Sequence, residues 1–425
     1  MARERDRPQR EERLSVAALL GRSAGDAGGD GSGGGAAGFA RALGPRQFAF
    51  PADHGPHPEF RTEWWYFTGN LATASGRRFG FQLTFFRAAL APRAAPRSSA
   101  WAAREVYLAH FTVTDVAAHR FRAFERWQRA ALGLAGAQAE PFRVWAGNWS
   151  AAAGPASGGG RVCGGATPPI RLTAAASRAA GTAEEDTTGA EDGRDAGGNN
   201  GAGGTGTGGA EEPSGAAIDL TLHALTPPVL EGDRGLSRKG GAPDNASYYY
   251  SLPRLAATGS LAVAGERYQV SGLAWMDREW STSALAPDEV GWDWFGLQLA
   301  DGTELMLYRL RRQGGGADPA SGGTLIGPRG EATPFALIAA RLEETGSWRS
   351  ERSGARYPAG WRLALPAEEL ELTIRPLVAD QELDLSFRYW EGAVAVAGRR
   401  HGRAIAGLGY VELTGYADSG SRTRR

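Results

Sequence analysis

Residues 63–71 read EWWYFTGNL, an acid followed by four consecutive aromatic side chains. In a β-strand, alternate side chains point to opposite faces, so Trp64 and Tyr66 share one face while Trp65 and Phe67 share the other. Large rings on both faces favour a strand of a β-barrel, with a lined interior and a covered exterior. The stretch therefore predicts a barrel strand that begins at an acidic residue.

The same pattern occurs a second time. Glu63-Trp64-Trp65 is echoed by Asp293-Trp294-Phe295, and each copy is followed by a turn-like segment, ATASGRR at 72–78 or ADGT at 300–303. The strand after each turn ends in an aromatic residue and an arginine, Phe86-Arg87 or Tyr308-Arg309. Two related β-domains, each opening with an aromatic hairpin, account for this repeat.

The turns also predict the register of both hairpins. Ser75 is midway between Glu63 and Arg87, and Asp301 is midway between Asp293 and Arg309. In a regular hairpin each acid lies directly across from its arginine, whereas a bulge would break this register. We expect two structural ion pairs, and we favour a packed core with a buried pair over a catalytic acid at Glu63.

The remaining sequence is rich in short alternating runs that end at Gly, Pro or Asp, which is typical of barrels and sandwiches. The expected strands are 80–87, 106–115, 265–275, 304–311, 369–377, 382–390 and 409–416. We predict an all-β chain with two lipocalin-like antiparallel barrels in tandem. The expected units are a disordered leader (1–46), a first barrel (47–250) with a disordered Gly-rich insertion (177–216), a second barrel (253–417) and a tail (418–425).

Composition excludes several classes of protein. Lys+Arg and Asp+Glu both number 47 in the 425 residues, so no net charge favours a nucleic-acid partner. A single cysteine, Cys163, excludes a disulfide framework within the chain. Neither an apolar run long enough for a transmembrane segment nor a signal peptide is evident, which predicts a soluble and, as written, cytoplasmic protein.

A metal site is conceivable in DHGPHPE at 53–59, where Asp53, His54, His57 and Glu59 lie close together. The alternative is a rigid capping loop, because two prolines and a glycine fix its backbone. The spacing matches no compact zinc motif. We therefore expect no metal and no other cofactor.

The segment GLAWMDREWSTSAL at 272–285 carries the densest group of candidate catalytic residues. Asp277 and Glu279 share a strand face and are flanked by Trp275 and Trp280. A carboxyl group in an apolar cavity has a raised pKa and can protonate an alkene, while aromatic faces stabilise the resulting cation. The alternative is structural, because Arg278 is adjacent and a paired acid loses this ability.

Several long motifs together resemble one protein family. They are FPADHGPHPEFRTEWWYFTGNL (50–71), LEGDRGLSRKG (230–240), ASYYYSLPRL (246–255), SGLAWMDREWST (271–282), GWDWFGLQLADGTELMLYRLR (291–311) and YWEGAV with GYVELTGY (389–394, 409–416). They are similar to the AttH-like proteins, which are grouped with carotenoid 1,2-hydratase (hydroxyneurosporene synthase) and often labelled predicted secreted hydrolases. The resemblance implies two lipocalin-like domains between about Phe48 and Tyr416. It also implies relatives that are often exported.

The resemblance also implies a chemistry, with departures in this chain. Carotenoid hydratases of the family add water to a terminal alkene without a redox cofactor, using an Asp helped by His, Trp and Tyr. The family's His-x-Trp pair falls on Arg278 and Trp280, and its Tyr-x-Asp pair on Tyr308 and Leu310. Trp280 and Tyr308 match, but the His and the Asp do not. Asp277, Glu279 or Asp293 would have to supply the acid.

Three functions are weighed at this point. The first, which we favour, is a lipocalin-like protein that binds a hydrophobic ligand, such as a lipid, isoprenoid or polyene, in an aromatic-lined cavity. The second is a cofactor-independent hydratase or lyase that acts on an isoprenoid double bond, with Asp277, Glu279, Asp293 or Tyr308 as catalytic residues. A carbohydrate-binding protein ranks last, because sugar platforms need rings on an open surface. The residues expected to line the ligand site are Trp64, Tyr66, Trp275, Trp280, Trp292 and Trp294.

Overall fold

The computed structural model describes residues 38–92, 99, 101–154, 167–177, 215–283 and 285–417. Most of the expected leader and insertion, and the tail, lie outside these residues. In the described part all regular elements are strands, apart from the short 3₁₀ helices η1 (Ala52–His54), η2 (Leu337–Ala339) and η3 (Pro366–Glu368). No helix among the described residues has the length and apolar character needed to cross a membrane.

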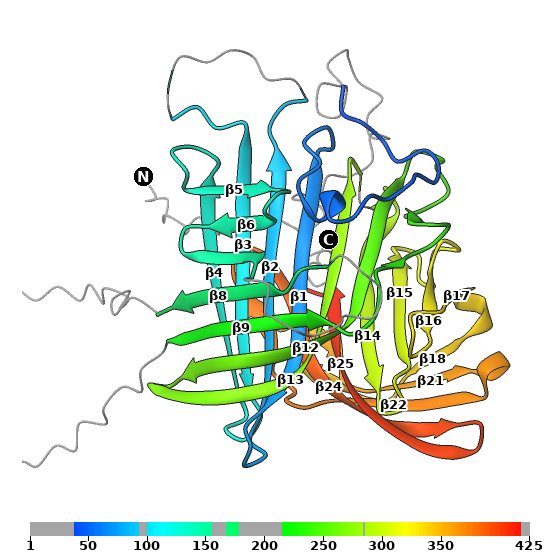
Figure 1. Ribbon diagram of the computed structural model, residues 1–425. Coiled ribbons are helices and arrows are strands. Elements are labelled where there is room, and N and C mark those ends of the chain that lie inside the picture. The colour runs from blue at the N-terminus through cyan, green and yellow to red at the C-terminus, as the bar shows by residue number, and fades with distance from the viewer. Residues whose placement is uncertain are drawn as a thin grey trace, which may run out of the picture.

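The first sheet has 13 strands, and its main path runs β4-β3-β2-β1-β13-β12-β9-β8-β7-β6-β5, with β10 and β11 also paired to β12 (Figure 1). Its strands are β1 (Thr62–Ala72), β2 (Arg78–Ala89), β3 (Glu105–Asp115), β4 (Arg120–Arg129), β5 (Ala135–Gln138), β6 (Arg143–Ala146), β7 (Trp149–Ala153), β8 (Ile170–Ala176), β9 (Ala216–Ala224), β10 (Val229–Leu230), β11 (Leu236–Arg238), β12 (Ala246–Val263) and β13 (Glu266–Ser281). One buried cluster draws on strands from β1 to β13, so the sheet curls around a single core.

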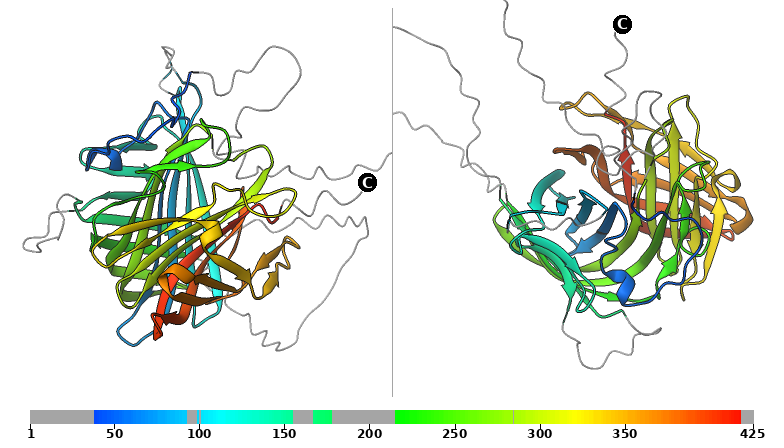
Figure 2. Two further views of the ribbon diagram at one scale, coloured as in Figure 1. Left: turned by 90° about the vertical axis from the view of Figure 1, so that its right-hand side faces the viewer. Right: turned by 90° about the horizontal axis from the view of Figure 1, so that it is seen from above.

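The second sheet has ten strands in the order β17-β16-β15-β14-β25-β24-β22-β21-β18, with β23 paired to β24. Its strands are β14 (Glu289–Leu299), β15 (Glu304–Arg312), β16 (Gly322–Ile326), β17 (Ala332–Ala336), β18 (Arg341–Glu344), β21 (Trp361–Leu365), β22 (Leu370–Pro376), β23 (Glu382–Asp384), β24 (Arg388–Arg400) and β25 (Arg403–Thr414). A separate two-stranded ribbon is formed by β19 (Ser347–Arg349) and β20 (Arg356–Pro358). Figure 2 shows the two curved sheets packed together. The all-β prediction with two curled antiparallel sheets is confirmed.

The strand pairing divides the chain at a different point from the expected one. We expected a boundary at 250–253, but β12 runs through these residues and β13 pairs with both β12 and β1. The first sheet therefore continues to Ser281. The Leu252-Pro253 pair at the expected boundary lies at a register shift between Leu252 and Leu255. Proline has no N–H for the ladder, so a bulge accommodates it without ending the strand.

Part of the expected disordered leader is packed against the first sheet. Phe39 and Ala42 are buried, and the Thr282 hydroxyl donates to the backbone carbonyl of Ala40. Arg41 forms an ion pair of 2.7 Å with Asp244. Ala42 packs against Leu236 and Ala246 of the first sheet. Such contacts depend on tertiary packing, which local composition does not reveal.

The two faces of β1 have different surroundings. Trp65 and Phe67 lie in the core of the first sheet. Trp64 and Tyr66 lie in a cluster shared by both sheets, together with Trp294 and Tyr410 of the second sheet. The face that we expected to line the interior of a barrel therefore lies against the second sheet. Hydrophobic alternation distinguishes two faces, but it does not tell which face points to the core and which to a neighbouring sheet.

Candidate functional site

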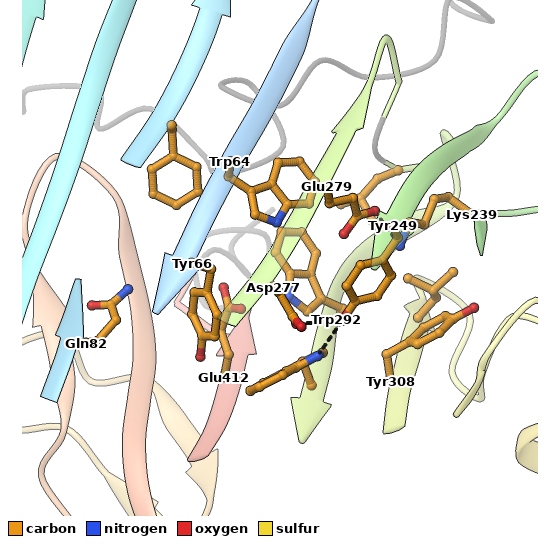
Figure 3. A pocket seen from close by; sticks show the side chains of 14 residues that line it. Trp64, Tyr66, Gln82, Lys239, Tyr249, Asp277, Glu279, Trp292, Tyr308 and Glu412 are labelled. Carbon is orange, nitrogen blue, oxygen red and sulfur yellow. Dashed lines mark hydrogen bonds and ion pairs between the residues drawn. The ribbon is translucent and has the colours of Figure 1, made fainter. Parts of the chain in front are cut away.

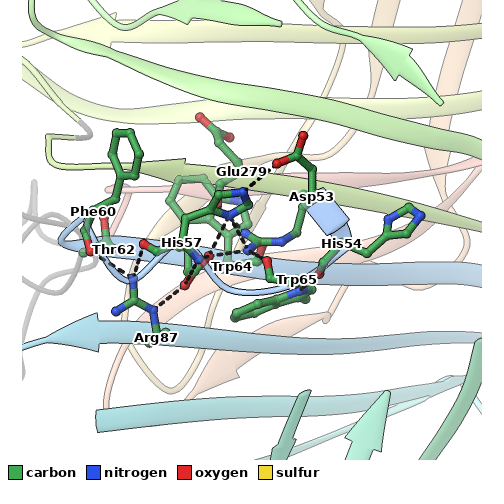
Figure 4. Close-up of polar contacts among 12 residues, drawn as sticks. Asp53, His54, His57, Phe60, Thr62, Trp64, Trp65, Arg87 and Glu279 are labelled. Atoms are coloured by element: carbon green, nitrogen blue, oxygen red, sulfur yellow. Dashed lines mark hydrogen bonds and ion pairs between the residues drawn. The ribbon is translucent and has the colours of Figure 1, made fainter. Parts of the chain in front are cut away.

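The acid that opens β1 is held by two arginines. Glu63 is fully buried and accepts hydrogen bonds from the guanidinium groups of Arg87 and Arg278 and, at 3.1 Å, from the backbone N–H of His57. Figure 4 shows where Arg87 and His57 lie. Its cross-strand partner is Arg87, in the register that the turn predicts. Burial alone would raise the pKa of Glu63, but Arg278 and Arg87 lower it well below the usual range. A carboxylate with two buried cations is a structural group and a poor proton donor.

The loop before β1 covers this ion pair. His57 Nε2 lies 3.0 Å from Asp53 Oδ1, and His54 Nδ1 lies 2.6 Å from the hydroxyl of Tyr250. Glu59 is exposed. Within the described part of the chain, no three acidic, histidine or cysteine side chains are grouped as metal ligands. The contacts fit the capping-loop alternative.

The second acid–arginine pair also lies away from solvent. Asp293 pairs in register with Arg309, and its carboxylate lies 2.5 Å from Arg309 Nη2 and 3.0 Å from Arg311 Nε. The hydroxyl of Tyr416 donates to it at 2.9 Å. The neighbouring tryptophans of β14 point to the opposite face. Asp293, expected as a candidate acid, is therefore placed in an ion-pair network on the far side of its strand from the aromatic cluster.

An aromatic pocket lies between the two sheets (Figure 3). The cavity itself is a narrow slot of about 70 Å³. The lining residues are Trp64, Tyr66, Gln82, Phe86, Lys239, Tyr249, Asp277, Glu279, Leu285, Trp292, Trp294, Tyr308, Leu310 and Glu412.

Most of the residues expected at a ligand site meet there, with two exceptions among the aromatic residues. Trp275 is not part of the lining, but it packs on Trp294 and donates to Asp277. Trp280 lies on the other face of β13, where its ring stacks on that of His57 at 3.7 Å between centroids. The two-residue period explains this, because 275, 277 and 279 share a face and 280 does not. Arg278 shares the Trp280 face, so neither group at the family's His-x-Trp position reaches the pocket.

The sequence reasoning missed several lining residues. Lys239 follows β11, Tyr249 lies on β12 and Glu412 lies on β25, so they come from segments far apart in the chain. Each also belongs to a motif used for family recognition, LEGDRGLSRKG, ASYYYSLPRL or GYVELTGY. That shared membership was the available signal. Their convergence depends on how the sheets pack.

Asp277 has the surroundings of a proton donor. Its Oδ1 accepts from Ser251 Oγ and Trp275 Nε1, each at 2.6 Å, and its Oδ2 accepts from the Tyr249 hydroxyl at 2.5 Å. Burial raises the pKa of Asp277 to about 7, although these three hydrogen bonds oppose the shift. No arginine or lysine makes an ion pair with it among the described residues. A large fraction of Asp277 is therefore protonated at neutral pH.

Glu279, two residues further along the same face, has the opposite surroundings. Its Oε1 forms an ion pair of 2.7 Å with Lys239 Nζ and also accepts from the Ser247 hydroxyl. Burial lowers the pKa of Lys239, but Glu279 raises it further, so the lysine is charged. Its ammonium also lies 5.0 Å from the centroid of the Tyr308 ring. Glu279 therefore has a cationic partner, whereas Asp277 has none among the described residues.

A third carboxyl group closes the pocket on the side of the second sheet. Burial raises the pKa of Glu412 to about 8, with a smaller contribution from Asp277. Glu412 is directly opposite Glu391 on β24, which accepts from the hydroxyl of Tyr66 at 2.6 Å. The pocket thus places two carboxyl groups with raised pKa values, Asp277 and Glu412, beside the lysine-paired Glu279, among aromatic faces. Such a set can donate a proton, accept one and stabilise a cation.

Comparisons with known proteins agree with this architecture. A model of the AttH-like family matches residues 41–180 and 170–416. A crystal structure of a protein from Nitrosomonas europaea described as an AttH is 32% identical, with a TM-score of 0.69, and the match covers 89% of this chain and 100% of that one. Kievitone hydratase from Nectria haematococca is 14% identical, with a TM-score of 0.59 over 90% of this chain and 98% of that one, and shows the same fold.

A curated protein is also similar in sequence. Dehydratase asqC of Emericella nidulans is 26% identical over 212 residues, or 46% of this chain. The match spans 57% of that dehydratase, little more than half its length. With the family match over both sheets, these similarities establish the membership that the motifs implied, and the chain belongs to the AttH-like family.

Proposed function

We propose that the protein is a cofactor-independent hydratase or dehydratase that takes a hydrophobic, isoprenoid-like substrate into the pocket between the sheets. The single observation that carries this proposal is Asp277, a buried acid with a pKa of about 7 beside aromatic faces, which makes no ion pair with an arginine or lysine of the described residues. The activities named for two relatives, a hydratase and a dehydratase, support the same reaction class.

In the hydration direction, the Asp277 carboxyl group transfers its proton to one carbon of the alkene. The π electrons form the new C–H bond and leave a cation on the other carbon, next to the faces of Trp64 and Trp292. A water oxygen bonds to that carbon, and the oxonium ion returns a proton to Asp277. The sum is alkene plus water giving alcohol, and dehydration is the reverse.

The carboxylate Glu279 has a distinct role in this scheme. Glu279 forms an ion pair with Lys239, and its carboxyl oxygens can orient the attacking water as hydrogen-bond acceptors. A proton donor and a hydrogen-bond acceptor on the same face of β13 form the pair that general acid–base catalysis needs.

Ligand binding without reaction is the second candidate function. It is favoured by the hydrogen bonds of Asp277, because Ser251, Trp275 and Tyr249 already occupy both carboxyl oxygens. A carrier would use the same apolar pocket and leave its ligand unchanged.

The test is turnover in H₂¹⁸O. The purified protein is extracted with organic solvent to identify any co-purified lipid by mass spectrometry, and it is then incubated with kievitone or neurosporene as probes. A hydratase gives an alcohol that carries ¹⁸O. The variant D277N should lose at least about a hundredfold in rate, as expected for a general acid. Binding, measured by quenching of the pocket tryptophans, should stay within a few fold.

The matched control is E304Q. Burial also raises the pKa of Glu304 to about 7, but this acid pairs with Arg254 and does not line the pocket. Its replacement should leave turnover intact. An unchanged lipid and quenching without ¹⁸O incorporation would favour the carrier. Turnover that survives D277N would overturn the assignment of the acid.

A further inference from the structure

We propose that Glu231, a buried acid outside the lining of the pocket, shares one proton with Asp277 through the hydroxyl of Ser251 and acts as the proton store of the site. Glu231 directly follows β10 and has no exposed surface. The shared proton is inferred from the hydrogen-bond geometry of the two acids. The use of this proton in catalysis rests on the proposed function.

The geometry is that of one hydroxyl between two acids. Ser251 Oγ lies 2.6 Å from Asp277 Oδ1 and 3.0 Å from Glu231 Oε1. A serine hydroxyl has one proton and can donate to only one of these oxygens. The other contact is satisfied when its carboxyl group is protonated and donates to Ser251 Oγ. Two ionised carboxylates would leave one short contact between acceptors, in a site from which water is largely excluded.

The other partners of Glu231 supply no positive charge at hydrogen-bond distance. Its second oxygen accepts from the hydroxyl of Thr324, which lies on β16 of the second sheet, and its backbone N–H donates to the Tyr249 carbonyl at 3.0 Å. Burial raises the pKa of Glu231 to about 8, with a smaller contribution from Asp277. Lys239 lowers it, but the ammonium is paired with Glu279.

Two arrangements of the shared proton therefore satisfy the network. In one, Glu231 donates to Ser251 and Ser251 donates to an ionised Asp277. In the other, Ser251 donates to an ionised Glu231, and Asp277 holds the proton. Moving from the first to the second breaks one O–H bond at Glu231 and one at Ser251 and forms one at Ser251 and one at Asp277. A pocket acid that has given up its proton is thereby recharged from the interior of the protein.

Charged groups around the pair set the background of its titration. The ion pair of Glu279 and Lys239, which has no net charge, lies beside Asp277 and Glu231. Glu412 lies near them on β25, and the phenol of Tyr249 on β12 donates to Asp277. Coupled acids of this kind titrate in two steps that belong to the pair.

The experiment is an infrared pH titration of the carboxylic acid C=O band in the full-length protein, without any substrate. The band lost in D277N identifies Asp277. In E231Q, the Gln amide can donate to Ser251, which then always donates to the Asp277 carboxylate, and no second carboxylate opposes the ionisation of Asp277. The Asp277 band should therefore titrate at least about one pH unit lower, a tenfold change in its proton affinity.

Two variants of Ser251 test the same titration, one with an expected shift in the opposite direction and one as a control. S251A removes a hydrogen bond to the Asp277 carboxylate, so the band should move to higher pH. S251T keeps a hydroxyl and should titrate as the wild type does. E304Q deletes a carboxyl group outside this network and should leave the Asp277 band unmoved.

An Asp277 band that stays in place in E231Q would overturn the shared proton, even if turnover is normal. Opposite shifts in E231Q and S251A without ¹⁸O incorporation would support the shared proton and reject the hydratase alone. The two proposals therefore fail separately.

Discussion

Glu63 and Asp277 lie on paired strands of one sheet, and both are buried, yet their environments have opposite effects. Glu63 points to the face that carries Arg87 and Arg278, which hold its pKa far below the usual range. Asp277, on β13, points to the pocket face, where burial raises its pKa to about 7. The two sites are only a few residues apart in the ladder, since Tyr66 is the cross-strand partner of Asp277.

The difference teaches that burial alone does not decide what an acid does. The pKa of a buried acid depends on how many cations lie on the same face of the sheet. The two-residue period of the strand sets which face the acid occupies. One sheet can therefore keep an acid with a strongly lowered pKa and an acid with a raised pKa side by side. Their roles can be separated by experiments that remove a cation, change the pH or remove a single hydrogen bond.

The largest effect on stability is expected when one of the two arginines beside Glu63 is removed. R278M leaves Glu63 buried with one arginine instead of two, so the free energy of unfolding should fall by about 3–5 kcal/mol. Denaturant unfolding measures this. The control R171A breaks the exposed bridge between Arg171 and Asp219 and should change stability by less than about 1 kcal/mol. Equal losses in the two variants would contradict the structural role of the buried network.

The pH dependence of stability should distinguish Asp277 from Glu63, because the two acids change the free energy of unfolding in opposite directions. Asp277 has a folded pKa of about 7 against 3.8 in the unfolded chain, so its stabilising contribution is complete below about pH 4 and is lost as the pH rises to 7. D277N should therefore gain stability relative to the wild type over this window, on the order of a few kcal/mol.

E63Q should behave in the opposite way. The folded pKa of Glu63 is lowered from 4.5, so its contribution is present above that pH and is lost as the pH falls below it. Unfolding free energies of wild type, D277N and E63Q at several pH values test both signs. If the unfolding free energy of D277N runs parallel to that of the wild type from about pH 4 to 7, the pKa of Asp277 is not raised in the folded protein.

The smallest effect concerns one hydrogen bond. Y249F removes the hydroxyl that donates to Asp277 Oδ2 and stabilises its ionised form, so the pKa of Asp277 should rise by about one unit. The infrared titration of the Asp277 band measures the shift. Y308F is the matched control, because the Tyr308 hydroxyl donates to the Ala320 carbonyl. A shift of the same size in Y308F would point to a general change of the pocket instead.

Much of the fold was predictable from local pattern. The alternation of EWWYF and the positions of the two turns predict strands, hairpins and a register in which Glu63 faces Arg87 and Asp293 faces Arg309. The place where the chain passes to the second sheet was not, because β12 continues through the bulge at Pro253 and the pairing of β12 with β13 is set by tertiary structure. The two-residue period places Trp280 on the face opposite to Asp277, and Asp293 on the face opposite to Trp292, but it did not reveal which of the two faces meets the other sheet.

The sequence by itself therefore determined the strands, their faces and the grouping of Asp277 with Glu279. Only the tertiary structure decided that a pocket lies between the sheets and that Lys239, Tyr249, Glu412 and Glu231 meet these acids. The physical reason is the distance in sequence over which each effect acts. Side-chain alternation is set by the local backbone, whereas the desolvation and charge that fix an acid's proton come from segments that packing brings together.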